Sequence, residues 1–296
     1  MIGALVDACL IIAPTVQAVE MEMLDDITQM LGVHRGAATW LSKGLKIEEA
    51  QISLRKDIRR VGSQGTKLQR LALARRADQL ATEIAGFFAE ASAFIPYEDD
   101  EEVLLDIQDV ESIVGDEDIV NNLGDKRPDR VKLPLPSNLG LEKCTALGAE
   151  KLIKQELKLR AGQANDALYE IRLALADKAV LFRTDIRHAA SYAKTTQAWS
   201  KVNAVEVIVN RHATIYRSCR SAMMRLSADD DMMARYQDLK DEDLKVSTAV
   251  SVPNARNHWH RSDKLAWFWS MDIPGDTEMN DWMSECKFQT MLIVSL

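Results

Sequence analysis

Two side chains on one predicted helix have the chemistry to bind a metal or carry a proton. His212 and Cys219 lie seven residues apart, which places an imidazole and a thiol on the same helix face. Zinc uses both types of ligand, but a structural zinc site needs four of them. Both residues also fall on an apolar stripe of that helix. We therefore predict that His212 and Cys219 pack in the core.

A second pair of histidines lies near the C-terminus. His258 and His260 are separated by one residue, and Asp263 follows. In an extended segment, residues i and i+2 point to the same side, so the two imidazoles could approach one ion. No pattern supplies the fourth ligand, and we predict no metal there.

Two acidic clusters are the remaining candidates for chemistry. Asp116-Glu117-Asp118 lacks the turn glycine and the regular oxygen spacing of a calcium loop. Asp229-Asp230-Asp231 opens a predicted short helix, where the helix dipole favours carboxylates. Glycine-rich phosphate loops are also missing from the sequence. We predict no catalytic, cofactor-binding or metal-binding residue, no small-molecule substrate, and a protein that is not an enzyme.

Charge is distributed unevenly along the 296-residue chain, whose net charge is -8. Residues 151–225 carry 14 Lys and Arg against 6 Asp and Glu, and residues 43–76 carry 10 against 3. Residues 97–129, in contrast, carry 2 against 13. The basic stretches could follow phosphates. The simpler explanation is the solvated, charged surface that helices normally have.

Cysteine spacing and the apolar N-terminus bear on localisation. Met1–Val19 is largely apolar, but Asp7 and Pro14 interrupt it and no basic segment precedes Leu10. It therefore predicts a buried helix better than a signal peptide or a membrane span. The four cysteines are far apart and predict a reduced, intracellular chain: Cys9, Cys144, Cys219 and Cys286.

Apolar residues at heptad spacing predict a first helical hairpin in residues 40–96, with Trp40 as a packing residue. The chain should break at Gly62–Gly65, with Thr66 as the N-cap of the second helix. A short loop between two apolar seams favours antiparallel packing. The second seam consists of Leu73, Ala77, Leu80, Ile84, Phe87, Ala91 and Phe94.

A second hairpin and a short helix are predicted in residues 137–245. Ser137 or Asn138 should cap a helix that begins near Leu141, and Ser227 should cap the short helix. The stretch 188–197 loses periodicity and should form the turn. One seam consists of Leu157, Ala161, Ala164, Leu168, Ile171, Leu175, Lys178 and Phe182. The returning seam consists of Val202, Val205, Val209, His212, Tyr216, Cys219, Met223 and Leu226.

Three further segments complete the predicted organisation. Residues 1–39 form an N-terminal segment without a firm assignment. Residues 97–136 are acidic, end in a proline-containing stretch, and predict a mainly disordered linker. Residues 246–296 are rich in aromatic side chains, and Trp267-Phe268-Trp269 is expected to pack in a core rather than stack on bases.

Three blocks of sequence resemble one fungal family. The first is WLSKGLKIEEAQISLRKDIRRVG, followed by LARRAD, within residues 40–78. The second begins at LPSNLG and continues with QELKLRAGQANDALYEIRLALADKAVLFRTDIRHA, within 135–190. The third is RYQDLKDEDLKVSTAVSVPNARN with LAWFWSMDIPGD and DWMSE, within 235–285. Together they are similar to the helical C-terminal region of KDZ (Kyakuja-Dileera-Zisupton) transposases.

The resemblance implies an origin but no active site. The family's nuclease domain lies N-terminal to this region and uses three metal-binding acidic residues, and nothing in this sequence matches it. The zinc modules associated with these elements are also missing. Residues 286–296, CKFQTMLIVSL, depart from the family pattern. We therefore expect a truncated, transposon-derived remnant that lacks the nuclease domain.

These observations predict an all-α protein of long, antiparallel, coiled-coil-like hairpins with an acidic linker. The expected function is non-catalytic: self-association as a homo-oligomer through the helical seams, or weak, non-specific DNA contact through the basic faces. The alternative is a host coiled-coil scaffold that does not bind nucleic acid. No membrane partner is expected, and the resemblance would be consistent with the nucleus.

Overall fold

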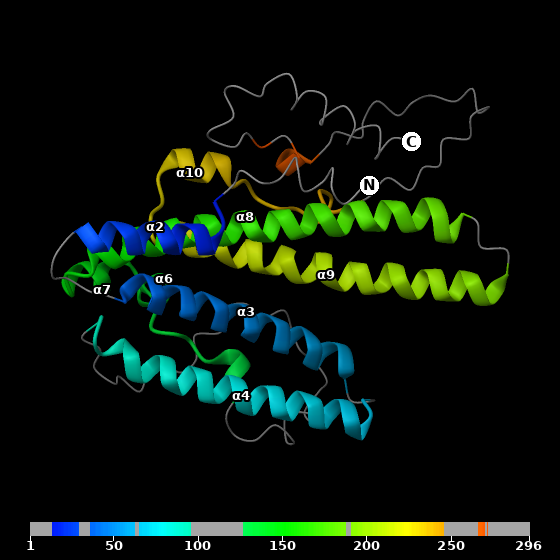
Figure 1. Cartoon of the computed structure of the whole chain (residues 1–296), viewed down its shortest axis with the longest axis horizontal. Helices are drawn as coiled ribbons and strands as arrows, with labels where there is room; N and C mark the ends of the chain where they lie inside the picture. The colour runs from blue at the N-terminus through cyan, green and yellow to red at the C-terminus, as the bar shows by residue number, and fades with distance from the viewer. Residues whose placement is uncertain are drawn as a thin grey trace. The chain divides into compact units, whose positions relative to one another are not determined.

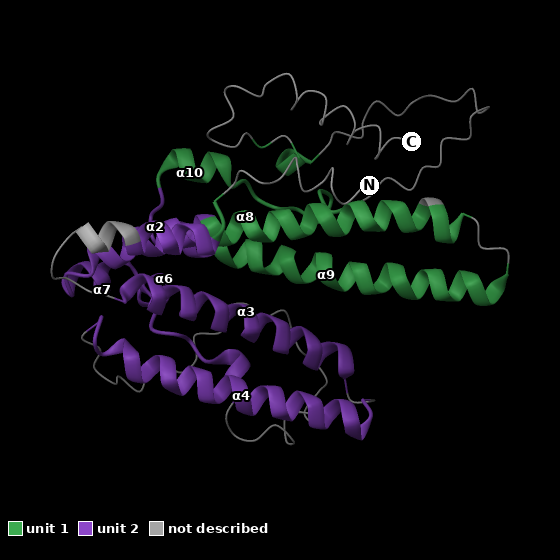
Figure 2. Cartoon of the chain, viewed as in Figure 1, with its two compact units in different colours: residues 1–15, 162–220, 229–296 green, residues 16–161, 221–228 purple. Residues whose placement is uncertain are grey.

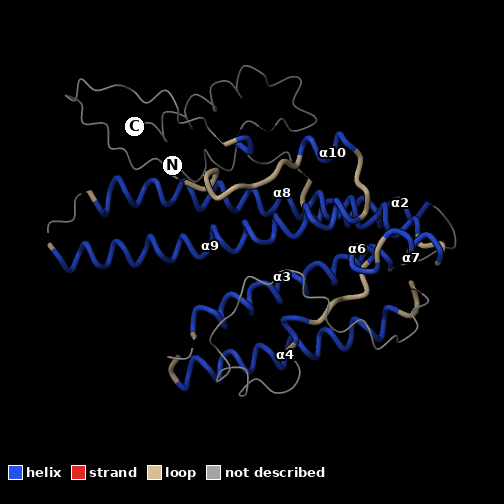
Figure 3. Tube along the Cα trace, turned by 180° about the vertical axis from the view of Figure 1, so that it is seen from behind, coloured by secondary structure: helices blue, strands red, loops and turns tan. Residues whose placement is uncertain are grey.

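In the computed structural model, the regular secondary structure of the described residues is entirely helical (Figures 1 and 3). No strand occurs among those residues, so the predicted all-α class is confirmed. None of the described helices combines the length and the apolarity that crossing a bilayer requires. The described residues are 14–29, 36–62, 65–95, 127–187, 191–245, 266–269 and 271.

The chain divides into two compact units (Figure 2). Unit 1 consists of residues 1–15, 162–220 and 229–296, and unit 2 consists of residues 16–161 and 221–228. The boundary falls inside the two longest helices, α8 and α9, rather than in the acidic segment 97–136.

Unit 2 contains the first predicted hairpin, preceded by α2 (Val16–Gln29). Helices α3 (Ala37–Val61) and α4 (Lys67–Ala91) run antiparallel in Figure 1. Thr66 caps α4 as predicted, because its side chain accepts from the Gln69 amide while Gln69 bonds back to the Thr66 amide. Such a cap contributes about 1 kcal/mol to stability.

The α4 seam is buried as its spacing predicts. Six of its positions are less than 9% exposed, and Phe87 is fully buried. Phe87 stacks on Trp40 of α3 with ring centroids 4.8 Å apart, so the predicted packing role of Trp40 is confirmed. Burial of each large apolar side chain contributes roughly 1.5–3 kcal/mol. The six positions are Leu73, Ala77, Leu80, Ile84, Phe87 and Ala91.

The prediction of a disordered linker is wrong for residues 127–136. Leu133 and Leu135 are 1% and 0% exposed and belong to the core of unit 2. A Cβ atom on Gly44 of α3 would lie 2.8 Å from both Leu135 and Phe87, so these side chains press directly on the glycine backbone. The apolar residues between the prolines therefore complete the hairpin core. The acidic part, 97–126, lies outside the described residues.

Hydrogen bonds fix the same segment to α3. The Gln51 side-chain amide donates to the carbonyls of Pro128 and Val131, both at 2.8 Å. These bonds orient a short 3-10 helix, η2 (Pro128–Arg130), beside the hairpin. Because Gln51 is buried, its polar atoms need such partners.

The entry to α8 differs from the predicted single cap. Ser137 lies inside α6 (Pro136–Leu139), and α7 (Leu141–Ala146) begins after Gly140. Helix α8 (Glu150–Leu181) begins later than expected. Instead of capping a helix, Ser137 donates its amide and its hydroxyl to the buried Glu156 carboxylate, at 2.9 and 2.6 Å.

Glu156 also belongs to a buried ionic cluster in unit 2. Arg160 is 1% exposed and lies 3.0 Å from Glu156 and 2.6 Å from Glu48, measured between guanidinium nitrogen and carboxylate oxygen. Its Nη2 also lies 3.2 Å from the Ser137 hydroxyl. The arginine therefore joins α3, α6 and α8 within one unit.

In unit 1, α8 and α9 (Tyr192–Arg225) form the second hairpin. The Cys219 thiol lies 3.0 Å from the side-chain amide oxygen of Gln163, and the Phe182 ring meets the Trp199 ring edge-on. The contact at the lower residue number in α8 is made with the higher residue number in α9, and the reverse holds for the second contact. The two helices are therefore antiparallel. Coiled-coil supercoiling stays a prediction.

Two local predictions in this region are wrong. The turn does not extend to residue 197, because α8 continues into a π-helix (Phe182–Ile186) and α9 already begins at Tyr192. The cap of α10 (Asp230–Arg235) is Asp229, whose carboxylate accepts from the Met232 amide at 2.9 Å. Ser227 instead has a positive φ of 54°.

The aromatic run 267–269 packs as expected. It forms the 3-10 helix η4 (Trp267–Trp269), in which Phe268 is fully buried. The Phe268 carbonyl accepts from Nε of Arg172 in α8 at 3.0 Å. The Trp267 ring lies 5.9 Å from the Tyr216 ring of α9. The core role of this run is confirmed for Phe268.

Candidate functional site

Of the two predicted core residues on α9, Cys219 lies in the interior of the second hairpin, whereas His212 is only partly covered. Cys219 is fully buried and bonded to Gln163, which confirms its predicted core position. His212 is half-buried, and its pKa falls to about 4, mainly through burial and also through the neighbouring Arg211 charge. The imidazole is therefore neutral at physiological pH.

The other sequence candidates are not assembled into a site. Asp229 serves as a helix cap, and Asp230 and Asp231 lie in the first turn of α10 as predicted. Within the described residues, no group of three or more His, Cys, Asp or Glu side chains is placed to hold a metal ion. The remaining candidates lie outside the described residues: His258, His260, Asp263 and Asp116–Asp118.

Positive charge is concentrated around the turn between α3 and α4. We call this surface the basic tip; it comprises the described part of residues 51–76 together with residues 127–132. It carries eleven Lys and Arg against two Asp. The cations are Arg55, Lys56, Arg59, Arg60, Lys67, Arg70, Arg75, Arg76, Arg127, Arg130 and Lys132.

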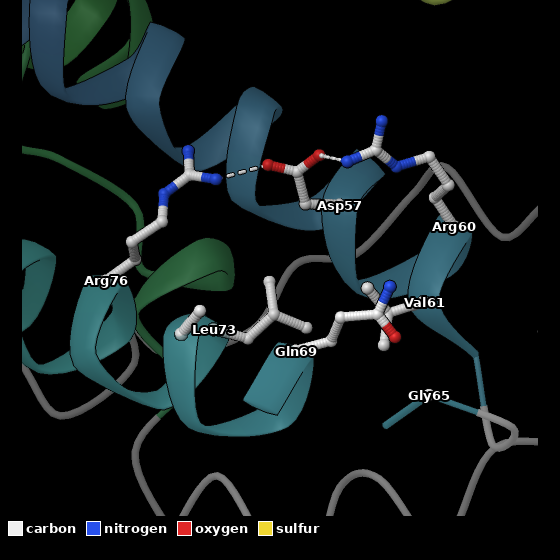
Figure 4. A pocket seen from close by; sticks show the side chains of 8 residues that line it. Asp57, Arg60, Val61, Gly65, Gln69, Leu73 and Arg76 are labelled. Atoms are coloured by element: carbon white, nitrogen blue, oxygen red, sulfur yellow. Dashed lines mark hydrogen bonds and ion pairs between the residues drawn. The ribbon is translucent and has the colours of Figure 1, made fainter. Parts of the chain in front are cut away.

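One carboxylate bridges the two helices at this tip. Asp57 of α3 pairs with Arg60 at 3.3 Å and with Arg76 of α4. Figure 4 shows the two guanidinium groups reaching Asp57 from opposite sides. Below them lies an open pocket of about 380 Å³, lined also by Gln69 and Leu73. The Asp57 carboxylate thus positions two arginine side chains, and the three groups together retain a net positive charge.

The second carboxylate holds the 127–132 segment in place. Asp129 is fully buried and accepts two bonds from the Arg127 guanidinium, at 3.1 and 2.9 Å. Arg55 of α3 lies 4.0 Å away from the same carboxylate. A two-pronged arginine–carboxylate bond is among the stronger and more directional polar contacts. The contact between Asp129 and Arg55 places the cations of this segment beside the hairpin.

Crowding of like charges is visible at Arg55. Burial lowers the pKa of its guanidinium, and the Asp129 carboxylate acts in the opposite direction. Neighbouring cations lower the pKa further: Arg59, Arg130 and Arg127. Folding therefore brings together positive charges that repel one another, an arrangement that a bound anion would stabilise.

Several side chains at the tip face solvent. Arg59, Lys67 and Arg75 are exposed, and none of them forms an ion pair with a described residue. Leu68 and Leu71, on the first turns of α4, are 79% and 48% exposed. The surface thus offers at least three cations and a small apolar area to a partner.

The opposite end of the same hairpin is aromatic. Trp40 stacks between Phe87 and Phe94, with centroid distances of 4.8 and 5.2 Å. Only one ion pair, Lys43 with Glu90, is found beside this stack among the described residues. The hairpin is therefore polarised, with packing rings at one end and cations at the other.

The basic stretch 151–225 is less available than its charge suggests. Arg160 is buried in the ionic cluster of unit 2, and Arg172 is buried against the Phe268 carbonyl. Three other cations pair with carboxylates on the same unit: Lys178 with Glu206, Lys201 with Asp185, and Arg217 with Asp241. Much of this charge serves internal contacts.

Residues 127–132 were predicted to belong to the linker, so their contribution to the basic tip was not expected. The signal was the change from acidic to basic residues at Arg127-Pro-Asp-Arg-Val-Lys132, directly before the apolar LPLP stretch. A surface with this density of cations, fixed on two helices, can bind phosphate groups.

No protein-family model, curated protein or solved structure matches this chain.

Proposed function

We propose that this chain is a non-catalytic helical protein, derived from a KDZ-type transposase, that contacts DNA without sequence specificity through the basic tip. The origin rests on the sequence blocks within 40–78, 135–190 and 235–285, which resemble the C-terminal region of these fungal transposases. The DNA contact rests on one observation, the eleven cations against two carboxylates at the tip.

The proposed contact works through charge and not through base reading. Exposed Arg59, Lys67 and Arg75 would approach phosphate oxygens and release the counterions that surround DNA. Contacts to phosphates fix the position of a protein on DNA but carry no sequence information. This role needs no catalytic group, in agreement with the proposal that the chain is not an enzyme.

Self-association through the helical seams is less well supported than DNA contact. The seam of α4 is buried within its own hairpin, and most of the α9 seam is buried as well, with Val205 and His212 only half-buried. A homo-oligomer would have to use other surfaces. The rival function, a host scaffold without nucleic-acid binding, would leave the basic tip with only a solvating role.

The test is binding of a fluorescein-labelled 20-base-pair duplex, measured by anisotropy at low salt. We expect binding by the full chain and a loss of at least about tenfold in affinity when three exposed cations are neutralised together. The three substitutions are Arg59→Gln, Lys67→Gln and Arg75→Gln. Circular dichroism checks that the variant keeps its helical content.

A matched control removes the same charge elsewhere. Lys151, Lys154 and Lys158 of α8 are also exposed, and their joint replacement by Gln should change affinity less than about twofold. If no duplex binds at low salt, or if both triple variants lose affinity equally, the proposal is wrong.

Two further measurements separate the rival functions. Incubation of plasmid DNA with Mg²⁺ or Mn²⁺ should leave it intact, and metal-dependent cleavage would contradict the non-catalytic proposal. Imaging of a tagged full chain should show nuclear accumulation if DNA is its partner.

A further inference from the structure

We infer that the ligand of the basic tip is the double-stranded nucleic-acid backbone, in preference to single strands. This inference rests on the proposed function and specifies its ligand. It follows from which side chains the tip lacks, how its cations are held, and how charge is spaced along the two kinds of nucleic acid.

The tip has no platform on which bases could stack. Residues 51–76 and 127–132 contain no Phe, Trp, Tyr or His. The described aromatic side chains that stack in this hairpin, Trp40, Phe87 and Phe94, lie at its other end and pack against one another. Proteins that hold single strands obtain about 1–3 kcal/mol per base from aromatic stacking. The tip must do without this contribution.

The cations of the tip sit on a rigid support. The capping box at Thr66 fixes the start of α4, and Gln51 ties the 127–132 segment to α3. The Asp57 and Asp129 carboxylates each hold two arginines from different positions in the chain. These contacts hold the backbone that carries the exposed Arg59, Lys67 and Arg75, and such a support suits a regular array of phosphates better than a flexible strand that must be ordered first.

Charge density favours the duplex further. Double-stranded DNA carries one negative charge per about 1.7 Å of axis, whereas a single strand carries one per about 3.4 Å. With stacking unavailable, affinity depends on the number of phosphates within reach. We therefore expect the full chain to bind a duplex at least about fivefold more tightly than a single strand of equal length.

The exposed leucines suggest a different ligand that the experiment must separate. Leu68 and Leu71 beside cations resemble the apolar and basic faces of helices that lie on anionic membranes. Two leucines form a small apolar area, whereas the cations come from α3, α4 and the 127–132 segment. The observations therefore favour a polyanion over a lipid surface.

The experiment compares three probes with the full chain at one ionic strength. They are a 20-base-pair duplex, each of its two strands alone, and vesicles of phosphatidylserine and phosphatidylcholine. A Leu68→Ser, Leu71→Ser double variant is measured in parallel. The inference predicts the tightest binding to the duplex, little change in duplex affinity in the double variant, and weak vesicle binding.

Each outcome has a defined meaning. Equal or tighter binding of single strands, with duplex binding intact, overturns the inference and leaves the proposed function standing. Vesicle binding that exceeds duplex binding and is lost in the leucine variant overturns the inference in favour of a membrane surface. Absence of binding to any nucleic acid removes the proposed function and the inference together.

Discussion

Two buried arginines on α8, one in each unit, are held in different ways. Arg160 in unit 2 is 1% exposed and pairs with the carboxylates of Glu156 and Glu48. Arg172 in unit 1 is 8% exposed, and the Phe268 carbonyl is its hydrogen-bond partner among the described residues. Burial lowers the Arg172 pKa to about 10.

The difference shows how the same residue type can fix a structure or merely be accommodated by it. Breaking a buried ion pair leaves an uncompensated charge, which is costly. Removing a buried cation that contacts only a neutral carbonyl relieves a desolvation cost while one acceptor loses its donor. Unit 2 should therefore depend on its arginine far more than unit 1 does.

The largest expected effect is that of Arg160→Met. The substitution leaves two carboxylates, Glu156 and Glu48, without their cation, and we expect a loss of about 3–5 kcal/mol in unfolding free energy. Urea denaturation of the full chain measures it. Lys158→Met is the control, since its ion pair with Glu22 at 3.9 Å is exposed and should contribute less than about 0.5 kcal/mol. Equal losses of unfolding free energy in the two variants would show that the buried ion pairs of Arg160 stabilise the protein no more than the exposed pair of Lys158.

Leu135→Ala tests whether the 127–136 segment belongs to the core of unit 2. Leu135 is fully buried and presses on Gly44, so truncation should leave a cavity and destabilise the protein by about 2–5 kcal/mol. Thermal unfolding gives the difference. Leu141→Ala, at a position 38% exposed, serves as the control. A Leu135→Ala protein as stable as the control would show that this segment behaves as a linker.

Arg172→Met tests the other side of the comparison. The substitution removes the hydrogen bond to the Phe268 carbonyl, but it also removes the cost of burying the guanidinium charge. We therefore expect the unfolding free energy to change by about 1 kcal/mol or less. The same urea titration applies. A loss as large as that of Arg160→Met would mean that an unrecognised partner holds Arg172.

The smallest effect concerns pH and His212 of unit 1. Its pKa lies near 4 in the folded chain against 6.5 ordinarily, so between these values the unfolded chain binds more protons. Stability is therefore full above pH 6.5 and falls as the pH drops towards 4. Because the ring is only half-buried, solvent screens it, and we expect less than about 1 kcal/mol from this group.

Unfolding midpoints at pH 7 and pH 4.5 measure this contribution. The wild-type chain should lose more stability over the interval than His212→Gln, which cannot acquire the proton. Carboxylates that titrate in the same range affect both proteins and cancel in the difference. Identical losses would show that His212 is not held neutral by the fold.

The sequence predicted α4 well and α8 poorly, for a physical reason. A heptad pattern predicts a helix that packs through a single apolar stripe. Helix α4 packs in this way, through the stripe from Leu73 to Ala91. Helix α8 is covered on several faces. Its predicted seam is buried only at the four central positions, while polar residues off that seam are buried too: Glu156, Arg160, Gln163, Asn165 and Arg172. Apart from the Glu156–Arg160 pair, which is four residues apart on α8, their partners are distant in sequence.

The basic tip was predictable in part. The cations of residues 43–76 were visible in the sequence, and Thr66 correctly marked the turn that gathers them. The 127–132 segment was not, because its attachment depends on Gln51 and on the buried Asp129, contacts across more than 70 residues. The net charge of residues 151–225 also overstated how much positive charge is available there to a partner, because some of their arginines form contacts within the protein.

The central claim is that the basic tip binds duplex nucleic acid through phosphate contacts. Its most direct test is the salt dependence of duplex affinity for the full chain and for the variant with Arg59, Lys67 and Arg75 replaced by Gln. Each phosphate neutralised contributes about -0.9 to the slope of log affinity against log salt. We predict a slope of about -3 or steeper for the full chain, and a slope that is shallower by roughly 3 for the variant. Affinity that is insensitive to salt, or equal slopes for the two proteins, would contradict it.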